Sequence, residues 1–136
     1  MKKDKIIKVK GLIIGKTSRR KQVRDKERKR KSMNIRYSDD KNIEIERLVS
    51  LFKSVEWESA KYPQELQLAI ANSHSVYTAW DGDKLVGLMN ALSDGVMTVY
   101  YHYLLVRPEY HKQKIGATLV KMMTDKYSRC RTQVVI

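Results

Sequence analysis

Cysteine is almost absent from this sequence, since Cys130 is the only one among 136 residues. A single thiol cannot form an internal disulfide or a zinc site built from several cysteines, so a disulfide-stabilised secreted scaffold is excluded. No apolar run approaches the ~18 residues expected of a membrane-spanning helix. Near the N-terminus, Lys8 and Lys10 interrupt the apolar stretch 6–14, which makes a poor signal peptide. We therefore expect a protein of the reducing cytoplasm with no membrane association.

Most familiar patterns of functional sites are also missing. The sequence has no internal repeat, no proline- or serine-rich linker, no metal-ligand cluster, no phosphate-binding P-loop and no Ser/His/Asp arrangement. We expect no metal ion, and a thiol nucleophile is not expected because Cys130 has no partner histidine at an informative spacing. The apolar fraction, 42%, is sufficient for a packed core, and the length suits one domain.

Charge divides the chain into two parts. The sequence has 28 Lys and Arg against 15 Asp and Glu, a net charge of +13. Residues 1–32 contain 15 basic and 3 acidic residues, a net of +12, whereas residues 33–136 contain 13 basic and 12 acidic residues, a net of +1. We therefore predict a basic, disordered extension over 1–32 and a folded domain over 33–136.

The extension is most basic over residues 19–31, RRKQVRDKERKRK. Such a run would attract phosphate-rich partners, so weak, nonspecific nucleic-acid binding is one hypothesis for residues 1–32. The run contains no aromatic residue on which bases could stack. Alternatives are that the extension has no specific partner or that translation starts at Met33, and residues 6–16 alternate loosely enough to form a strand or hairpin.

Hydropathy periodicity from Met33 onward predicts a mixed β-sheet flanked by helices, an α/β fold that some schemes class as α+β. Strands are predicted at 33–37, 75–80, 84–92, 96–106 and 133–136. A first helix is predicted at 43–55, with an apolar stripe of Ile45, Leu48, Val49, Phe52 and Val55, and a second begins at Pro63, with Leu66, Ala69 and Ile70 facing inward. A third helix is predicted from the spacing of Ile115, Leu119, Met122, Met123 and Tyr127. The last helix would be a crossover that makes the final two strands parallel. The final strand would be an exposed edge, which makes a homodimer a further hypothesis.

The stretch 103–120, YLLVRPEYHKQKIGATLV, predicts an anion site. A strand ends, a basic loop follows, and Ile115, Gly116 and Ala117 open a helix. A helix N-terminus offers unpaired amides and a partial positive charge, which suit a phosphate or pyrophosphate. Gly116 and Ala117 keep that entrance clear of bulky side chains, and Lys112 and Lys114 add cationic reach.

The same stretch resembles the acetyl-CoA-binding motif of the GNAT superfamily of N-acetyltransferases. That motif reads L-x-V-x-P-x-Y, then Q/R-x-x-G-x-G/A, then an apolar helix. Residues 104–110 match its first half, and Ile115, Gly116 and Leu119 match in the second. His111 stands where Gln or Arg is usual, and Lys114 stands where the first Gly is usual. A left-handed backbone at Lys114 would cost roughly 1–2 kcal/mol of conformational free energy.

The resemblance implies a GNAT-like three-layer fold and an acetyl-CoA-dependent N-acetyltransferase. A neutral amine on a small molecule or peptide would attack the thioester of the cosubstrate directly, and one backbone amide of the long strand would stabilise the developing oxyanion. The implied cosubstrate-binding residues are Leu104, Leu105 and Val106 for the pantetheine arm and His111, Lys112, Gln113, Lys114, Ile115, Gly116 and Ala117 for the pyrophosphate.

Residues for catalysis and for the acceptor are less sharply indicated. His102 and Tyr103, expected on opposite faces of the strand, are candidates for the general base or proton relay, and His102 has a suitable ordinary pKa of ~6.5. Alternatively, the aromatic residues 100–103 fill the core and the cleft. Glu56, Trp57 and Glu58 follow the first helix and would bind a cationic amine, although a solvated loop would explain them as well.

Relatives in the superfamily continue beyond the last predicted strand with a helix and two strands, including a tyrosine that protonates the leaving thiolate. This sequence ends at Ile136, so we expect those C-terminal elements to be missing. Two alternatives to an active enzyme therefore stay open. One is a catalytically impaired, truncated GNAT-like protein, and the other is a nucleic-acid-associated protein anchored by residues 1–32.

Overall fold

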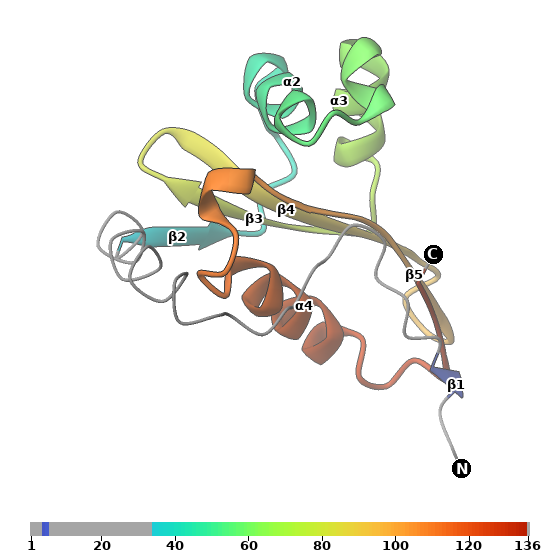
Figure 1. Cartoon of the computed structure of the whole chain (residues 1–136). Helices are drawn as coiled ribbons and strands as arrows, with labels where there is room; N and C mark the ends of the chain where they lie inside the picture. The colour runs from blue at the N-terminus through green and yellow to red at the C-terminus, as the bar shows by residue number, and fades with distance from the viewer. Residues whose placement is uncertain (1–3, 6–33, 136) are drawn as a thin grey trace.

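The computed structural model describes residues 4–5 and 34–135, which form one sheet with helices on both faces (Figure 1). Within these residues, six strands are ordered β1-β6-β5-β4-β3-β2. The strands are β1 (Asp4–Lys5), β2 (Ile35–Ser38), β3 (Ser75–Asp81), β4 (Lys84–Ser93), β5 (Thr98–Val106) and β6 (Thr132–Val135). The helices are α2 (Ile45–Ser54), α3 (Pro63–Ala71) and α4 (Ile115–Lys126), with short 3₁₀ turns η1 (Glu58–Lys61) and η2 (Pro108–Tyr110).

The sheet is mixed, as predicted. Strands β2 to β5 pair antiparallel with their neighbours, whereas β6 runs parallel to β5 and to β1. Helix α4 connects β5 to β6, which is the crossover that two parallel neighbours require. The predicted order of elements from residue 33 onward and the three-layer α/β class are therefore confirmed.

Each face of the sheet has its own hydrophobic core. Helices α2 and α3 cover one face, and α4 covers the other (Figure 1). The core under α2 and α3 includes Leu48, Phe52 and Ile70, and the core under α4 includes Leu119 and Met123. These five side chains are fully buried, so the sheet is held rigidly between two packed layers.

The helices that cover the first face follow the predicted pattern with two differences. In α2, Leu51 is fully buried, although the predicted stripe did not include it. In α3, Leu66 and Ile70 are buried as predicted, but Ala69 is exposed, so that part of the prediction is wrong. The buried residues of α3 are four apart, so they form a narrow stripe along one side of the helix, and Ala69 lies outside it.

The start of α4 is held close to the middle of the sheet. Gly87 in β4 faces Ile115 and Leu119, and a Cβ atom at residue 87 would lie 3.1 Å from Ile115 Cγ2 and 3.2 Å from Leu119 Cδ1. Only glycine leaves this space open without a shift of the helix. The position of the α4 N-terminus relative to the sheet is therefore fixed by this contact.

The prediction that the final strand is a sheet edge is wrong at its first two residues. Strand β6 lies between β5 and β1, with Asp4 opposite Thr132 and Lys5 opposite Gln133. The homodimer stays a prediction, without support from this edge. Apart from residues 4–5, which form β1, the other predictions for residues 1–32, namely disorder, a strand or hairpin at 6–16 and nucleic-acid binding, lie outside the described residues. In the described part of the chain, no helix combines the length and apolar character needed to cross a membrane.

Candidate active site

A cavity of about 440 Å³ lies between the end of α2 and the end of β5. Its lining comes from two segments that are distant in sequence. The lining residues are Ser54, Val55, Glu56, Trp57, Leu104, Leu105, Val106, Pro108 and His111. The fold thus brings two residues predicted to bind the acceptor, Glu56 and Trp57, to the strand predicted to bind the cosubstrate. Ser54, Val55 and Pro108 were not predicted as site residues, and their only sequence signal is adjacency to residues that were.

The part of β5 that lines the cavity has one open edge. Strand β6 pairs with β5 only over residues 98–101, and no strand of the described chain pairs with Leu104–Val106 on that side. The amide of Arg107 donates to Val86 O at 2.8 Å, toward β4. Because successive amides of a strand point to opposite sides, those of Leu104 and Val106 face the open edge. This edge can accept an extended ligand as a sheet partner.

His111 connects the loop after β5 to the same edge. Its Nε2 lies 2.8 Å from the carbonyl oxygen of Val106. A carbonyl can only accept, so this geometry assigns the proton to Nε2. The His111 side chain therefore anchors the loop at the cavity lining, although the residue as a whole is exposed.

Strained backbone is concentrated around the cavity. In the described chain, the non-glycine residues with positive φ are Glu56 at 58°, Lys112 at 67° and Lys114 at 63°. Glu56 lines the cavity, and the two lysines follow His111 in the loop. Lys114 thus adopts the left-handed conformation that its motif position predicts, which costs a non-glycine residue about 1–2 kcal/mol. Such strain persists where the surrounding structure imposes it, commonly at functional sites.

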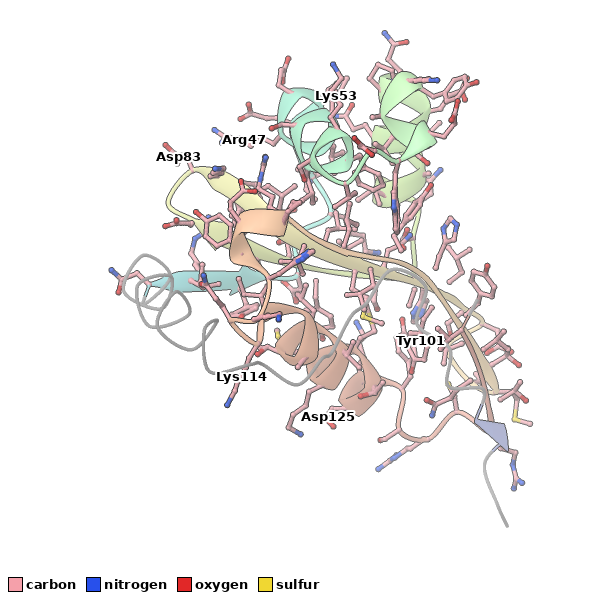
Figure 2. All side chains as sticks on the ribbon, viewed as in Figure 1. Arg47, Lys53, Asp83, Tyr101, Lys114 and Asp125 are labelled. Atoms are coloured by element: carbon pink, nitrogen blue, oxygen red, sulfur yellow. The ribbon has the colours of Figure 1, made fainter. Side chains whose placement is uncertain are left out.

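The N-terminus of α4 presents unpaired amides, as predicted. The amide of Thr118 donates to Lys114 O at 2.9 Å, whereas within the described part of the chain the amides of Ile115, Gly116 and Ala117 have no acceptor. Lys114 makes no side-chain cap, and its side chain points outward from the helix start (Figure 2). Nothing in the described chain therefore plugs this anion-binding end of the helix.

Gln113, the remaining polar residue of the predicted loop, has an unusual environment. Its Oε1 is buried and has no hydrogen-bond donor among the described residues. The side chain of Ile115 and the backbone of Gly116 are buried, and Ala117 is exposed. The loop therefore offers main-chain donors and lysine charge, while its apolar members fix the helix to the core.

Aromatic side chains pack around Trp57, which lines the cavity. The Tyr103 ring lies 5.6 Å from that of Trp57 and 5.0 Å from that of Phe52, and its hydroxyl is 2.7 Å from Ser59 Oγ. Glu58 lies outside the lining and pairs with Lys61 at 3.0 Å, with both side chains exposed. Of the three residues predicted to bind the acceptor, the structure therefore brings Glu56 and Trp57 to the cavity and leaves Glu58 at the surface.

His102 and Tyr103 lie on the same side of β5, so the prediction that they occupy opposite faces is wrong. Their ring centroids are 4.0 Å apart and inclined by 32°. The cause is a β-bulge, since Met89 pairs with Leu104 and Ala91 with Tyr101, which leaves two residues of β5 opposite Asn90 alone. His102 itself is outside the cavity lining. Partial burial lowers the pKa of its imidazole, which favours the neutral form.

A buried arginine joins the two walls of the site. Arg107 directly follows the cavity-lining strand and is 7% exposed. Its Nε donates to Leu85 O at 2.7 Å and its Nη2 to Ser50 Oγ at 2.7 Å, so one guanidinium bonds both β4 and α2. The sequence placed Arg107 within the motif but gave no indication of this role.

Comparison with known proteins identifies the family. The model of the acetyltransferase (GNAT) family matches residues 42–135, which is more than half of the chain. The chain belongs to the GNAT acetyltransferase family. The resemblance found in residues 103–120 and the GNAT-like fold are thereby confirmed, and this GNAT protein is by family an acetyltransferase. Comparison with curated proteins finds no match.

Solved structures agree with the family assignment. A GNAT-family acetyltransferase from Streptococcus pneumoniae TIGR4 is 27% identical, with a TM-score of 0.66 and coverage of 75% of this chain and 74% of that one. Two others show the fold alone. An aminoglycoside acetyltransferase from an uncultured soil metagenomic sample, in complex with sisomicin, is 17% identical, with a TM-score of 0.56 and coverage of 75% and 76%. An aminoglycoside 6'-N-acetyltransferase complexed with coenzyme A is 24% identical, with a TM-score of 0.57 and coverage of 69% and 56%.

Proposed function

We propose that this GNAT protein transfers an acetyl group from acetyl-CoA to a primary amine on a small cationic molecule or a peptide. One observation carries the proposal. A single cavity is bordered by the open edge of β5 on one side and by Glu56 and Trp57 on the other. An acyl donor and an amine acceptor could therefore meet in it.

The donor side suits acetyl-CoA, which would supply an activated acyl group as a thioester. The open-edge amides of Leu104 and Val106 would bond the pantetheine arm, and one of them would donate to the thioester oxygen as negative charge develops there. The unpaired amides at the start of α4 and the charges of Lys112 and Lys114 would hold the pyrophosphate. The solved neighbour in complex with coenzyme A supports this choice of donor.

The acceptor side suits a cation. The Glu56 carboxylate would attract an ammonium group, and the Trp57 ring would offer it a π face. His102, which partial burial keeps in its neutral form, would take the proton that the amine must lose, and the Tyr103 hydroxyl is the alternative. The neighbour in complex with sisomicin supports a polyamine-like acceptor, because an aminoglycoside carries several amino groups.

The proposal is tested in two steps with the full chain. First, millimolar acetyl-CoA should raise the melting temperature, because a ligand at about 100 times its Kd adds about 2.7 kcal/mol to the folded state. Second, release of free thiol should be measured with sisomicin, spermidine and a peptide with a free N-terminus as acceptors. An unchanged melting temperature together with no thiol release would reject the proposal and support the catalytically impaired alternative.

A further inference from the structure

A side chain of β4 is hydrogen-bonded to the β-bulge of β5. At the bulge, His102 and Tyr103 together face Asn90, so the regular ladder of main-chain hydrogen bonds cannot continue. The amide of Tyr103 donates instead to Oδ1 of Asn90, at 2.7 Å. Asn90 is 1% exposed, so this bond is shielded from competition with water.

The other end of the Asn90 amide is also fixed. Its Nδ2 donates to Ser73 Oγ at 2.9 Å, and Ser73 Oγ donates to Ala69 O at 2.9 Å, in the last turn of α3. Ser73 is 1% exposed as well. A short chain of buried hydrogen bonds therefore runs from the end of α3, through Asn90, to the bulge. These hydrogen bonds assign the orientation of the Asn90 amide, since the reversed orientation would turn its NH2 group, a donor, toward the N–H donor of Tyr103.

The bulge decides which way the end of β5 faces. Before it, Val99 and Tyr101 belong to the core under α4; after it, Leu104 and Val106 belong to that core, and Leu105 to the core under α2 and α3. Alternation without a bulge would place 103 and 105 on the same face as 99 and 101. The extra residue shifts the pattern by one, and a shift by one moves every later side chain to the other face and every later amide to the other edge.

We infer that Asn90 is a positioning residue of the acetyl-transfer site. By accepting the Tyr103 amide, it holds the bulge that turns Tyr103 to the α2 side, where regular alternation already places His102, and presents the amides of Leu104 and Val106 to the open edge. Ser73 orients Asn90 and couples it to α3. Neither residue lines the cavity, so both act through β5. The inference rests on the proposed function for its kinetic consequence but not for its structural one.

The test compares three variants of the full chain. Asn90→Ala removes the acceptor, whereas Asn90→Asp keeps an oxygen for the Tyr103 amide and changes the group that faces Ser73. Gln133→Ala is the matched control, because Gln133 is another buried amide, 6% exposed, whose bonds to Tyr101, Tyr127 and Cys130 lie under α4. Each variant is melted first, and all measurements are made well below its own melting temperature.

The structural measurement is NMR and needs no substrate. In the wild type, ring-to-ring NOEs between His102 and Tyr103 and a hydrogen-bonded shift of the Tyr103 amide proton are expected. Asn90→Ala should lose both, while Asn90→Asp and Gln133→Ala should keep both. Retention of the wild-type NOEs and amide shift in Asn90→Ala would overturn the inference, whatever the activity of the enzyme.

The kinetic measurement separates positioning from stability. Misplaced reacting groups lower turnover by about tenfold or more, so Asn90→Ala should lose at least that much kcat. KM for acetyl-CoA should rise as well, because the amides of Leu104 and Val106 that would bond the pantetheine arm lose their direction. Asn90→Asp should recover most of kcat, and Gln133→Ala should keep it despite a lower melting temperature. An equal loss of kcat in Gln133→Ala and Asn90→Ala would overturn the positioning role. If the wild type itself turns over no amine, the proposed function fails, and the NMR result still decides whether Asn90 holds the bulge.

Discussion

His111 Nε2 lies 2.8 Å from the carbonyl oxygen of Val106, and this bond joins the predicted pyrophosphate loop to the open edge of β5. Loss of one such hydrogen bond is worth about 1 kcal/mol, which corresponds to roughly fivefold in affinity. We therefore expect His111→Ala to weaken acetyl-CoA binding about fivefold, measured by isothermal titration calorimetry. His111→Gln retains a hydrogen-bond donor, and its affinity for acetyl-CoA should lie within about twofold of that of the wild type. Equal affinities for all three proteins would show that the bond does not organise the loop.

The acceptor side is tested by two neighbouring glutamates. Glu56 lines the cavity, whereas Glu58 is exposed and paired with Lys61. Reversal of a charge about 4 Å from a solvated ammonium changes the interaction by about 1 kcal/mol in each direction. Glu56→Lys should therefore raise KM for a cationic amine by about thirtyfold, and Glu58→Lys should change it less than about twofold. KM for spermidine is measured by steady-state kinetics in both variants. A similar KM in the two would show that Glu56 does not contribute to acceptor binding.

The pH dependence of the reaction should reflect the pKa of the His102 imidazole. Partial burial lowers the pKa of this imidazole, so the neutral form that accepts a proton prevails down to a pH below the ordinary value of ~6.5. The rate should therefore rise with pH to a midpoint below ~6.5 and level off at neutral pH. The same shift has a linked effect on stability: the unfolded chain binds the proton more readily, so acidification below ~6.5 destabilises the fold.

Two histidine variants separate these effects. His102→Gln should remove or displace the ascending limb of kcat/KM, whereas His74→Gln, at a histidine outside the cavity lining, should leave the profile unchanged. The profile is recorded between pH 5 and pH 9 (about four units, to bracket the ordinary histidine range). An unaltered ascending limb in His102→Gln would transfer the proton-accepting role to another group.

Lys114 stores strain that a single substitution should release. Its φ of 63° is left-handed, a conformation that costs most residues about 1–2 kcal/mol and glycine almost nothing. After allowance for the greater freedom of glycine in the unfolded chain, Lys114→Gly should stabilise the fold by up to about 1 kcal/mol. The melting temperature should rise by about 3 °C. Lys114→Ala loses the charge but keeps the strained backbone, so an equal rise in that variant would attribute the gain to charge alone.

The Tyr103 hydroxyl either supports structure or acts in the reaction, and Ser59 discriminates between these roles. Tyr103 OH and Ser59 Oγ are 2.7 Å apart. Tyr103→Phe and Ser59→Ala should each lower the free energy of unfolding, measured with urea, by about 1 kcal/mol. The double variant should lower it by no more than either single variant. If the hydroxyl also moves a proton, Tyr103→Phe should lower kcat well beyond Ser59→Ala. Equal kcat values in the two variants would leave Tyr103 a structural role only.

Much of this fold was predictable because its signals are local. The stretch 103–120 combines a strand, a proline stop and a glycine-containing helix start, and each of these signals acts within a few residues. The order of strands and helices follows from apolar periodicity for the same reason. The cavity combines these segments with the turn after α2, where Glu56 and Trp57, two of the three residues predicted to bind the acceptor, line it.

The features that the sequence did not reveal depend on partners distant in the chain. Nothing near His102 and Tyr103 indicates a bulge, because its cause is the Asn90 side chain on another strand. Likewise, the pairing of Asp4 with Thr132 joins nearly opposite ends of the sequence, which periodicity cannot detect. Glu58 turns to Lys61 instead of the cavity because η1 places the two side chains three residues apart on one turn.

The guanidinium of Arg107 has a consequence for how ligands enter. Because it is bonded to both Leu85 O on β4 and Ser50 Oγ on α2, separation of α2 from β4 would break the bond to Ser50. Loss of a hydrogen bond to a charged group is costly, so Arg107 resists movement of α2 away from the sheet. If the acceptor binds beside Trp57 as proposed, discrimination among amines would then depend on which of them fit a cavity whose walls do not move apart.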